Sequence, residues 1–149
     1  MRKDARGFSM VELMVILAVM GIVSAFALPS FLTYWQSATL RAGSEELRTV
    51  LNDARQLAIA SNNTVCVTSS TTTIHYRVGA CGNTAYVGPG TDSSGSIRLV
   101  TAVRITNNPQ VTFTYLGGAS TSGAYTVQNP VTGTTQTVTV TASGRITIP

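Results

Sequence analysis

The residues able to do chemistry are few, and they do not form a catalytic pattern. His75 is the only histidine, and it stands between Ile74 and Tyr76 with no carboxylate or thiol beside it. A lone histidine of this kind is usually a surface or packing residue. The glycine-rich segment 88–96 is followed by no lysine, so it does not fit a phosphate-binding loop. We therefore expect no enzyme, no catalytic residue and no cofactor.

Two cysteines, Cys66 and Cys81, are the remaining reactive side chains, and they stand 15 positions apart. No Cys and His residues share the spacing of a metal site. The two thiols form either a disulfide or two free cysteines, and spacing alone leaves both open. The compartment of the protein decides between them, and the N-terminus bears on that compartment.

Glu12 is a carboxylate inside an apolar stretch and needs a physical reason. Residues 8–28 are mostly Met, Val, Leu, Ile, Ala and Phe, and about 20 such residues in a helix span a bilayer. A charge near the bilayer centre costs about 2.5–3.5 kcal/mol. Basic residues Arg2, Lys3 and Arg6 precede the stretch, and no lysine follows it. The positive-inside rule then keeps the N-terminus in the cytoplasm and sends the rest across.

A secretory signal peptide and a plain membrane anchor both fit the basic start and the apolar run. The small residues of segment 24–29 would also suit a signal peptidase. Neither alternative has a use for Glu12, although a carboxylate at the start of a helix is favourable in itself. Both remain open on the residues alone.

The segment "RGFSMVELMVILAVMGIVSAFALP" resembles the N-terminus of type IV prepilins and type II secretion pseudopilins. The resemblance implies a leader, residues 1–7, that a prepilin peptidase removes by cutting between Gly7 and Phe8. It also implies N-methylation of Phe8 and an assembly role for Glu12, which meets the terminal amine of a neighbouring subunit. Such a pair favours correct register, because a lone charge in apolar surroundings stays uncompensated.

A long helix is expected from Phe8 to about Asn62. Pro29 ends the purely apolar run, but a helical pattern resumes at once, so we expect a kink there. Asn tolerates the left-handed conformation, which makes segment 61–63 a plausible helix end. Arg48, Asp53 and Arg55 should lie mostly on the solvent side. The opposite side carries an apolar stripe of Leu40, Leu47, Val50, Leu51, Ala54, Leu57 and Ala58.

Beyond the helix the pattern changes to period two, which is typical of strands. Glycine, proline, asparagine and serine separate the alternating segments, which are 64–70, 73–79, 96–101, 111–116, 124–129, 136–143 and 145–149. We predict one antiparallel sheet with one face buried against the helix stripe, a hairpin turn at 68–73 and a loop at 81–96. The fold class is α+β, the pilin fold: a long N-terminal helix, half transmembrane and half amphipathic, on an antiparallel sheet.

This order of elements resembles the GspH/FimT group of minor pilins and pseudopilins. The resemblance implies a cleaved leader 1–7, a transmembrane and assembly helix 8–36, and a periplasmic globular domain 37–149. It implies a minor pilin of a type IV pilus, with a tip or priming complex as one location, or a minor pseudopilin of a type II secretion system. The partners would be other pilin subunits, contacted through the N-terminal helix, the prepilin peptidase and the inner membrane.

A domain outside the cytoplasm makes a Cys66–Cys81 disulfide the default expectation. Major pseudopilins often bind calcium through C-terminal carboxylates, but no Asp or Glu follows Asp92 in this chain. Calcium takes several oxygen ligands, commonly carboxylates. We therefore expect no metal site.

Some FimT-like pilins are associated with DNA uptake through a C-terminal "GRxR" motif. Gly144 and Arg145 match the motif, but Thr147 stands where the second arginine would be. The formal net charge is +4, and seven basic and five acidic residues, a net +2, remain without residues 1–7. So small an excess does not by itself indicate nucleic-acid binding. Weak DNA binding through Arg145 and an ordinary exposed arginine both stay open.

Overall fold

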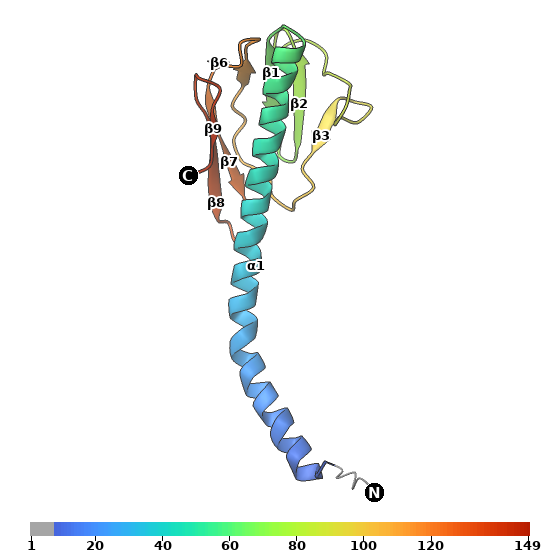
Figure 1. The fold of residues 1–149 in the computed structure, drawn as a ribbon, viewed down its shortest axis with the longest axis vertical. Helices are drawn as coiled ribbons and strands as arrows, with labels where there is room; N and C mark the ends of the chain where they lie inside the picture. Colours follow the sequence, from blue (N-terminus) through green and yellow to red (C-terminus); the bar gives the residue numbers. More distant parts are fainter. Residues whose placement is uncertain (1–7) are drawn as a thin grey trace, which may run out of the picture. The chain divides into compact units, whose positions relative to one another are not determined.

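The computed structural model describes residues 8–149, except for the side chains of residues 27–29. The expected leader, including Gly7 of the cleavage site, lies outside the described residues. The chain divides into two compact units between Trp35 and Gln36. A single helix, α1 (Met10–Ala60), supplies the first unit and continues into the second, where nine strands follow it (Figure 1).

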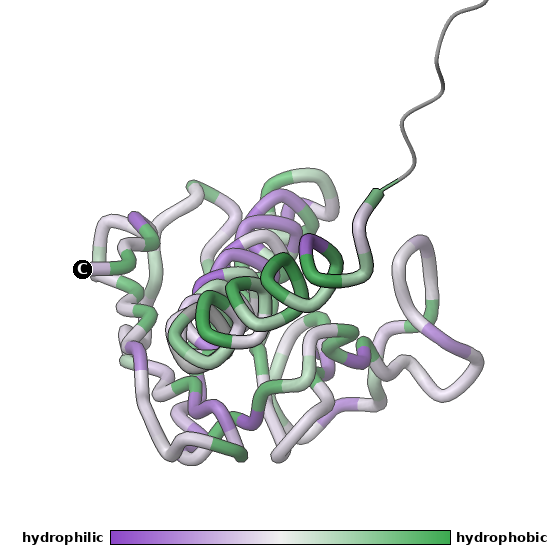
Figure 2. Tube along the Cα trace, turned by 90° about the horizontal axis from the view of Figure 1, so that it is seen from below, coloured by the Kyte–Doolittle hydropathy of each residue, from purple (hydrophilic) through white to green (hydrophobic). Residues whose placement is uncertain are grey.

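The first unit consists of the apolar part of α1, and almost every described side chain in it is exposed. Figure 2 shows this stretch as predominantly hydrophobic. No single helix among the described residues is long and apolar enough to cross a membrane, whereas Met10–Phe26 and Ser30–Ala60 meet those requirements jointly across a bend at a short break. Pro29 lies in that break, and its role as the cause of a kink stays a prediction.

The helix ends where the sequence predicts. Asn62 adopts a left-handed conformation, with φ 48°, just after the last helical residue. The main-chain N–H of Asn62 bonds the oxygen of Ile59 at 3.2 Å, and that of Asn63 bonds the oxygen of Ala58 at 3.2 Å. These two bonds satisfy carbonyl groups that the end of the helix leaves free, in the pattern of a Schellman motif.

The strands form two antiparallel sheets that pack on the second half of α1. Figure 1 shows β2 and β3 on one side of this part of the helix and β7, β8 and β9 on the other. The five-stranded sheet has the order β3-β2-β1-β5-β6, with β1 (Val65–Ser69), β2 (Thr73–Val78), β3 (Ser96–Arg98), β5 (Val111–Phe113) and β6 (Ala119–Thr121). The four-stranded sheet has the order β4-β7-β8-β9, with β4 (Arg104–Ile105), β7 (Gly123–Gln128), β8 (Thr135–Val140) and β9 (Ile146–Thr147).

The prediction of one continuous sheet is therefore wrong. The segment expected as a strand at 96–101 leaves the sheet after Arg98 and crosses to the second sheet. On the way the N–H of Leu99 bonds the oxygen of Thr72 at 3.1 Å, and the N–H of Ile105 bonds that of Thr71 at 2.8 Å. Strands β4 and β6 were not expected.

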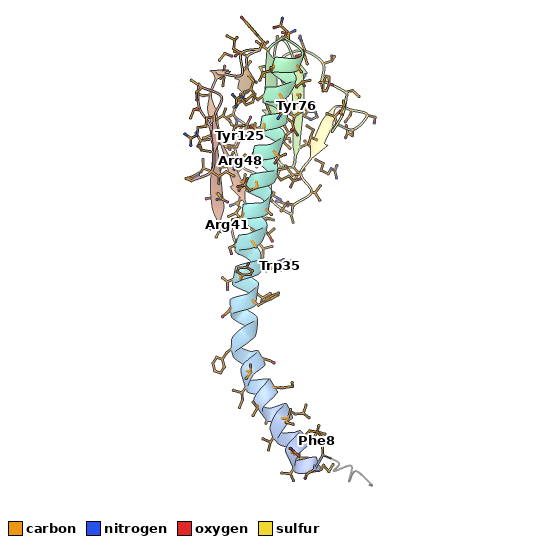
Figure 3. The ribbon with its side chains drawn as sticks, viewed as in Figure 1. Phe8, Trp35, Arg41, Arg48, Tyr76 and Tyr125 are labelled. Carbon is orange, nitrogen blue, oxygen red and sulfur yellow. A yellow bond between two sulfur atoms is a disulfide. The ribbon has the colours of Figure 1, made fainter. Side chains whose placement is uncertain are left out.

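The core lies between the helix stripe and the inner faces of both sheets. Every predicted stripe residue is buried except Leu57, which is half-buried. The stripe packs against the largest buried side chains of the sheets, among them Phe113, Ile74, Val127 and Val138. Figure 3 places Tyr76 on the β2 side of the helix and Tyr125 on the β7 side. The amphipathic half of α1 thus joins two sheets that share few strand contacts of their own.

Candidate functional site

The start of α1 carries the residues that the N-terminal motif singles out. Phe8 is exposed, and Glu12 lies exposed in the first turn of the helix. The N–H of Leu13 bonds the oxygen of Ser9 at 3.1 Å, so Ser9 closes the first turn. Within residues 8–149, Glu12 makes no ion pair. The helix dipole stabilises the negative charge of Glu12 at this position, and no ion pair within residues 8–149 neutralises that charge.

Apolar side chains surround Glu12 on all sides of the helix. Large exposed hydrophobic residues continue beyond it to the end of the first unit, and they include Met10, Val11, Leu13, Met14, Val15, Leu17, Val19, Met20, Ile22, Val23, Phe26, Phe31 and Leu32. A helix that is apolar all round is stable where lipid or other apolar helices cover it. Glu12 is therefore an acidic side chain on a helix surface that is otherwise suited to contact lipid or other apolar helices.

A disulfide joins Cys66 and Cys81, whose Cα atoms lie 5.1 Å apart, as the sequence predicts. Cys66 is fully buried in β1, and Cys81 lies near the start of the long loop that follows β2. The same loop is held by a bond from the N–H of Gly79 to the oxygen of Thr64 at 2.7 Å. The disulfide thus fastens the loop to the centre of the five-stranded sheet.

The end of that loop is closed by Asp92. Its carboxylate accepts hydrogen bonds from the hydroxyl of Ser94 at 2.7 Å and from the N–H of Ser96 at 2.8 Å. These bonds hold the pKa of Asp92 below its usual range. His75 lies opposite Ser96 on β2, and its Nδ1 has no hydrogen-bond partner among the described residues. The Asp92 carboxylate thus closes this turn, and it lies near enough to His75 for the charge of the imidazole to contribute to lowering the pKa of Asp92.

The two matching residues of the C-terminal motif have different environments. Gly144 is buried with φ 77°, and a Cβ atom there would overlap the carbonyl oxygen of Gly117. Arg145, the next residue, is exposed, and Thr147 is half-buried in β9 opposite Thr139. Close packing against Gly117 thus explains the glycine at position 144 without any ligand. The guanidinium of Arg145, in contrast, is accessible to a ligand.

Arg55 corrects an expectation, because it does not lie on the solvent side of the helix. It is half-buried, and its Nε donates a hydrogen bond to the oxygen of Gly117 at 2.7 Å. The bond links α1 to the turn between β5 and β6. The charged head pairs with a main-chain carbonyl, so its burial is compensated.

Four other arginines of the second unit have no hydrogen bond or ion pair from their head groups within residues 8–149. Arg48 pairs with Glu45 at 3.3 Å, and the guanidinium of Arg77 donates to the oxygen of Asn83. The four arginines without such a partner among residues 8–149 are Arg41, Arg98, Arg104 and Arg145. These exposed cations are the charges through which the globular part can meet an anionic partner.

Comparison with known families supplies the assignment. The family model described as Prokaryotic N-terminal methylation motif matches residues 2–28. The family model described as Type II transport protein GspH matches residues 43–144, more than half of the chain. The chain belongs to the GspH family. The sequence resemblance to minor pilins and pseudopilins of this group is thereby confirmed.

Solved structures of the type IV minor pilin FimU from Pseudomonas aeruginosa are similar to this GspH-family chain. In a crystal form of space group P21 the TM-score is 0.56 at 18% identity, covering 78% of this chain and 92% of FimU. In space group P65 the TM-score is 0.52 at 15% identity, covering 74% and 92%. At such identity the likeness concerns the fold. It confirms the expected pilin fold, a long helix packed on antiparallel sheets.

Sequence reasoning missed the polar residues with which α1 holds its loops. Glu46 accepts two main-chain hydrogen bonds from residues 100 and 101, and buried Asn129 donates from Nδ2 to the oxygen of Gln36 at 3.2 Å. Nothing in a 3.6-residue pattern marks which polar side chain will meet a loop dozens of residues away. For Asn129 the neighbouring Pro130 and Gly133 indicated a turn, but not its contact with the helix.

Proposed function

We propose that this GspH-family protein is a minor pilin, a structural subunit that is built into a type IV pilus. The observation that carries the proposal is the exposed apolar helix headed by one carboxylate, Glu12, and attached to a globular part with its own core and disulfide. Such a chain resides in a membrane by its helix, with the globular part in the periplasm, and leaves it by packing that helix among others. No step of this role requires enzymatic chemistry.

Processing supplies the group that Glu12 needs. Cleavage by a prepilin peptidase between Gly7 and Phe8 creates an ammonium group at the N-terminal end of the helix, whose dipole is already positive there. In apolar surroundings neither this ammonium nor a carboxylate is stable alone. A subunit entering a filament brings its terminal amine to the Glu12 of a neighbour, and the pair fixes the register between the two helices.

A minor pseudopilin of a type II secretion system is the second candidate, and the family's description as a type II transport protein favours it. The fold likeness to FimU, a type IV minor pilin, favours the pilus. Both assemblies would use the same helix and the same peptidase. Recovery of the protein in pili sheared from the cell surface, with no secretion defect in a deletion strain, is expected for the pilus. Secretion loss with normal piliation would indicate the pseudopilus.

The assembly role is tested by Glu12→Ala, with Glu45→Ala as the matched control on the exposed face of the same helix. Both variants should accumulate in the inner membrane as the wild type does, because removing a charge does not hinder insertion. Glu12→Ala should be depleted from filaments, and Glu45→Ala should not. Equal incorporation of the two variants would remove the assembly role of Glu12.

Mass spectrometry of the mature protein tests the processing step. The expected terminus is N-methylated Phe8, and a bulky residue at position 7 should block cleavage, because the peptidase must grip an uncrowded backbone. A terminus after Ala27, as a signal peptidase would leave it, contradicts the proposal as a whole.

A further inference from the structure

The loop between β3 and β4, residues 99–103, is fixed to the helix at two points. Glu46 accepts a hydrogen bond from the N–H of Val100 at 2.6 Å and another from the N–H of Thr101 at 3.1 Å. One helical turn before it, a Cβ atom at Gly43 would lie 2.5 Å from Cγ2 of Val103, so the loop packs directly on the helix backbone. The loop therefore has a definite position before any partner arrives.

A groove of about 350 Å³ opens along this loop, where the edges of the two sheets come together. Arg98, the last residue of β3, and Arg104, the first of β4, both line it and both are exposed. Val100 and Pro130 lie in the same lining. We call this surface the arginine groove.

The residues that line the arginine groove carry two positive charges and no negative one. None of its lining residues is acidic, and nothing within residues 8–149 forms an ion pair with Arg98 or Arg104. The nearby carboxylate of Glu46 is already engaged by the two main-chain N–H groups. Two guanidinium groups offer several donors in a planar fork, the geometry that binds carboxylates.

Apolar side chains beside the arginines indicate what kind of molecule bears the negative charge. Val100 is 92% exposed, and Val131, which follows Pro130, is 79% exposed. A sugar-phosphate backbone would gain nothing from covering them, whereas arginines next to apolar residues are typical of protein–protein interfaces. A fixed loop also reduces the entropy cost of docking.

We infer that the arginine groove docks an acidic segment, with an apolar side chain next to its carboxylates, from a different subunit of the same filament. The inference rests on the proposed function as a filament subunit. A second copy of this chain is a poor occupant, because residues 8–149 carry a formal net charge of +2 and would place positive against positive. The partner is a subunit whose matching surface is negative.

The test uses a photo-crosslinking amino acid in place of Val100 in the full chain, expressed in cells that assemble the filament. The matched control has the same amino acid in place of Val87, another exposed valine, which lies outside the groove lining. Irradiation should trap a pilin-type subunit from position 100, and mass spectrometry should find Asp or Glu within the trapped segment. Trapping from position 87 should be much weaker.

Charge reversal then tests the arginines themselves. The double variant Arg98→Glu and Arg104→Glu should lower crosslinking from position 100 about tenfold or more, while Arg145→Glu should leave it unchanged. Lysine at both positions should retain more crosslinking than glutamate does, because lysine keeps the positive charge and loses only the planar fork. Reversing the acidic residues of the trapped segment to lysine should restore crosslinking to the Glu variant.

The outcomes separate this inference from the proposed function. If the protein assembles into filaments but position 100 traps no more than position 87, the inference is overturned and the pilin role stands. Crosslinking that the charge reversal does not weaken, or a trapped segment without carboxylates, overturns it as well. A protein that never enters a filament overturns both.

Discussion

The hydroxyl of Tyr76 donates a hydrogen bond to the main-chain oxygen of Val50 at 2.5 Å, which joins β2 to the C-terminal half of α1. The second buried tyrosine, Tyr125 on β7, is fully buried, yet its hydroxyl has no hydrogen-bond partner among the described residues. The same functional group thus holds the helix on one side of the core and contributes no bond on the other. The two residues form a natural pair for comparison.

Removing each hydroxyl should have opposite effects on stability. Tyr76→Phe should lower the free energy of unfolding by about 1 kcal/mol, the usual net value of one hydrogen bond. Tyr125→Phe should be neutral or stabilising, because it removes a buried polar group that has no partner within residues 8–149. Urea unfolding of the full chain in detergent measures both. Equal losses would show that the hydrogen bond to Val50 adds nothing to what a buried hydroxyl without a partner contributes.

Alkaline pH should unfold the globular part through the same two residues. Burial raises the pKa of Tyr76, with a smaller contribution from the charge of Asp53, and burial raises the pKa of Tyr125. The unfolded chain ionises these phenols near pH 10, while the folded chain keeps them neutral. The contribution of the two tyrosines to the free energy of unfolding is therefore complete below about pH 10. Above that pH it falls by about 1.4 kcal/mol per pH unit for each tyrosine.

Unfolding measured between pH 8 and pH 11 checks this slope. Tyr125→Phe should halve it, because one of the two titrating groups is gone. A stability that stays level above pH 10 in the wild type would contradict the prediction.

Sequence periodicity predicted those parts of the fold that repeat. The helix stripe shows its 3.6-residue period over several turns, so Leu47, Leu51 and Ala54 are buried as expected. Long strands such as β2 and β8 also show their period of two. The division into two sheets has no such signal, because it depends on the two-residue strand β4. The arginine groove depends on the same crossing, so its two arginines could not be paired from the sequence.

Two glycines with the same backbone conformation should respond differently to alanine. Gly144 and Gly133 have φ values of 77° and 72°, which lie in the left-handed region. Alanine at either position should therefore lower the free energy of unfolding by about 1–2 kcal/mol. Only at Gly144 would that atom also overlap a carbonyl oxygen, that of Gly117; at Gly133 no described atom lies within 4 Å. Gly144→Ala should therefore cost at least about 1 kcal/mol more than Gly133→Ala.

The melting temperatures of both variants in detergent give the comparison. Equal shifts would mean that the turn containing Gly144 moves freely away from Gly117, and the packing reason for this glycine would fail.

The Cys66–Cys81 disulfide should stabilise the globular part by about 3 kcal/mol, the chain-entropy value for a loop of this length. Replacing both cysteines with serine should lower the melting temperature, and a reducing agent should have the same effect on the wild type. The reducing agent should not change the serine variant further, which is the control. A wild-type melting temperature that is insensitive to reduction would contradict the prediction.

Binding of duplex DNA, if the C-terminal motif acts as its resemblance implies, should be weak and equal for unrelated sequences. Arg145 is exposed, and an arginine that contacts phosphates alone would not distinguish between base sequences. Few arginines release few counterions, so the binding constant should depend only weakly on salt concentration.

Arg145→Ala should reduce DNA binding without changing the melting temperature, because an exposed arginine stabilises little. Thr147→Arg, which completes the motif, should strengthen binding and increase its dependence on salt concentration. Labelled DNA titrated at two salt concentrations decides the matter: equal, near-zero binding by all three proteins leaves Arg145 as a surface residue of a purely structural subunit.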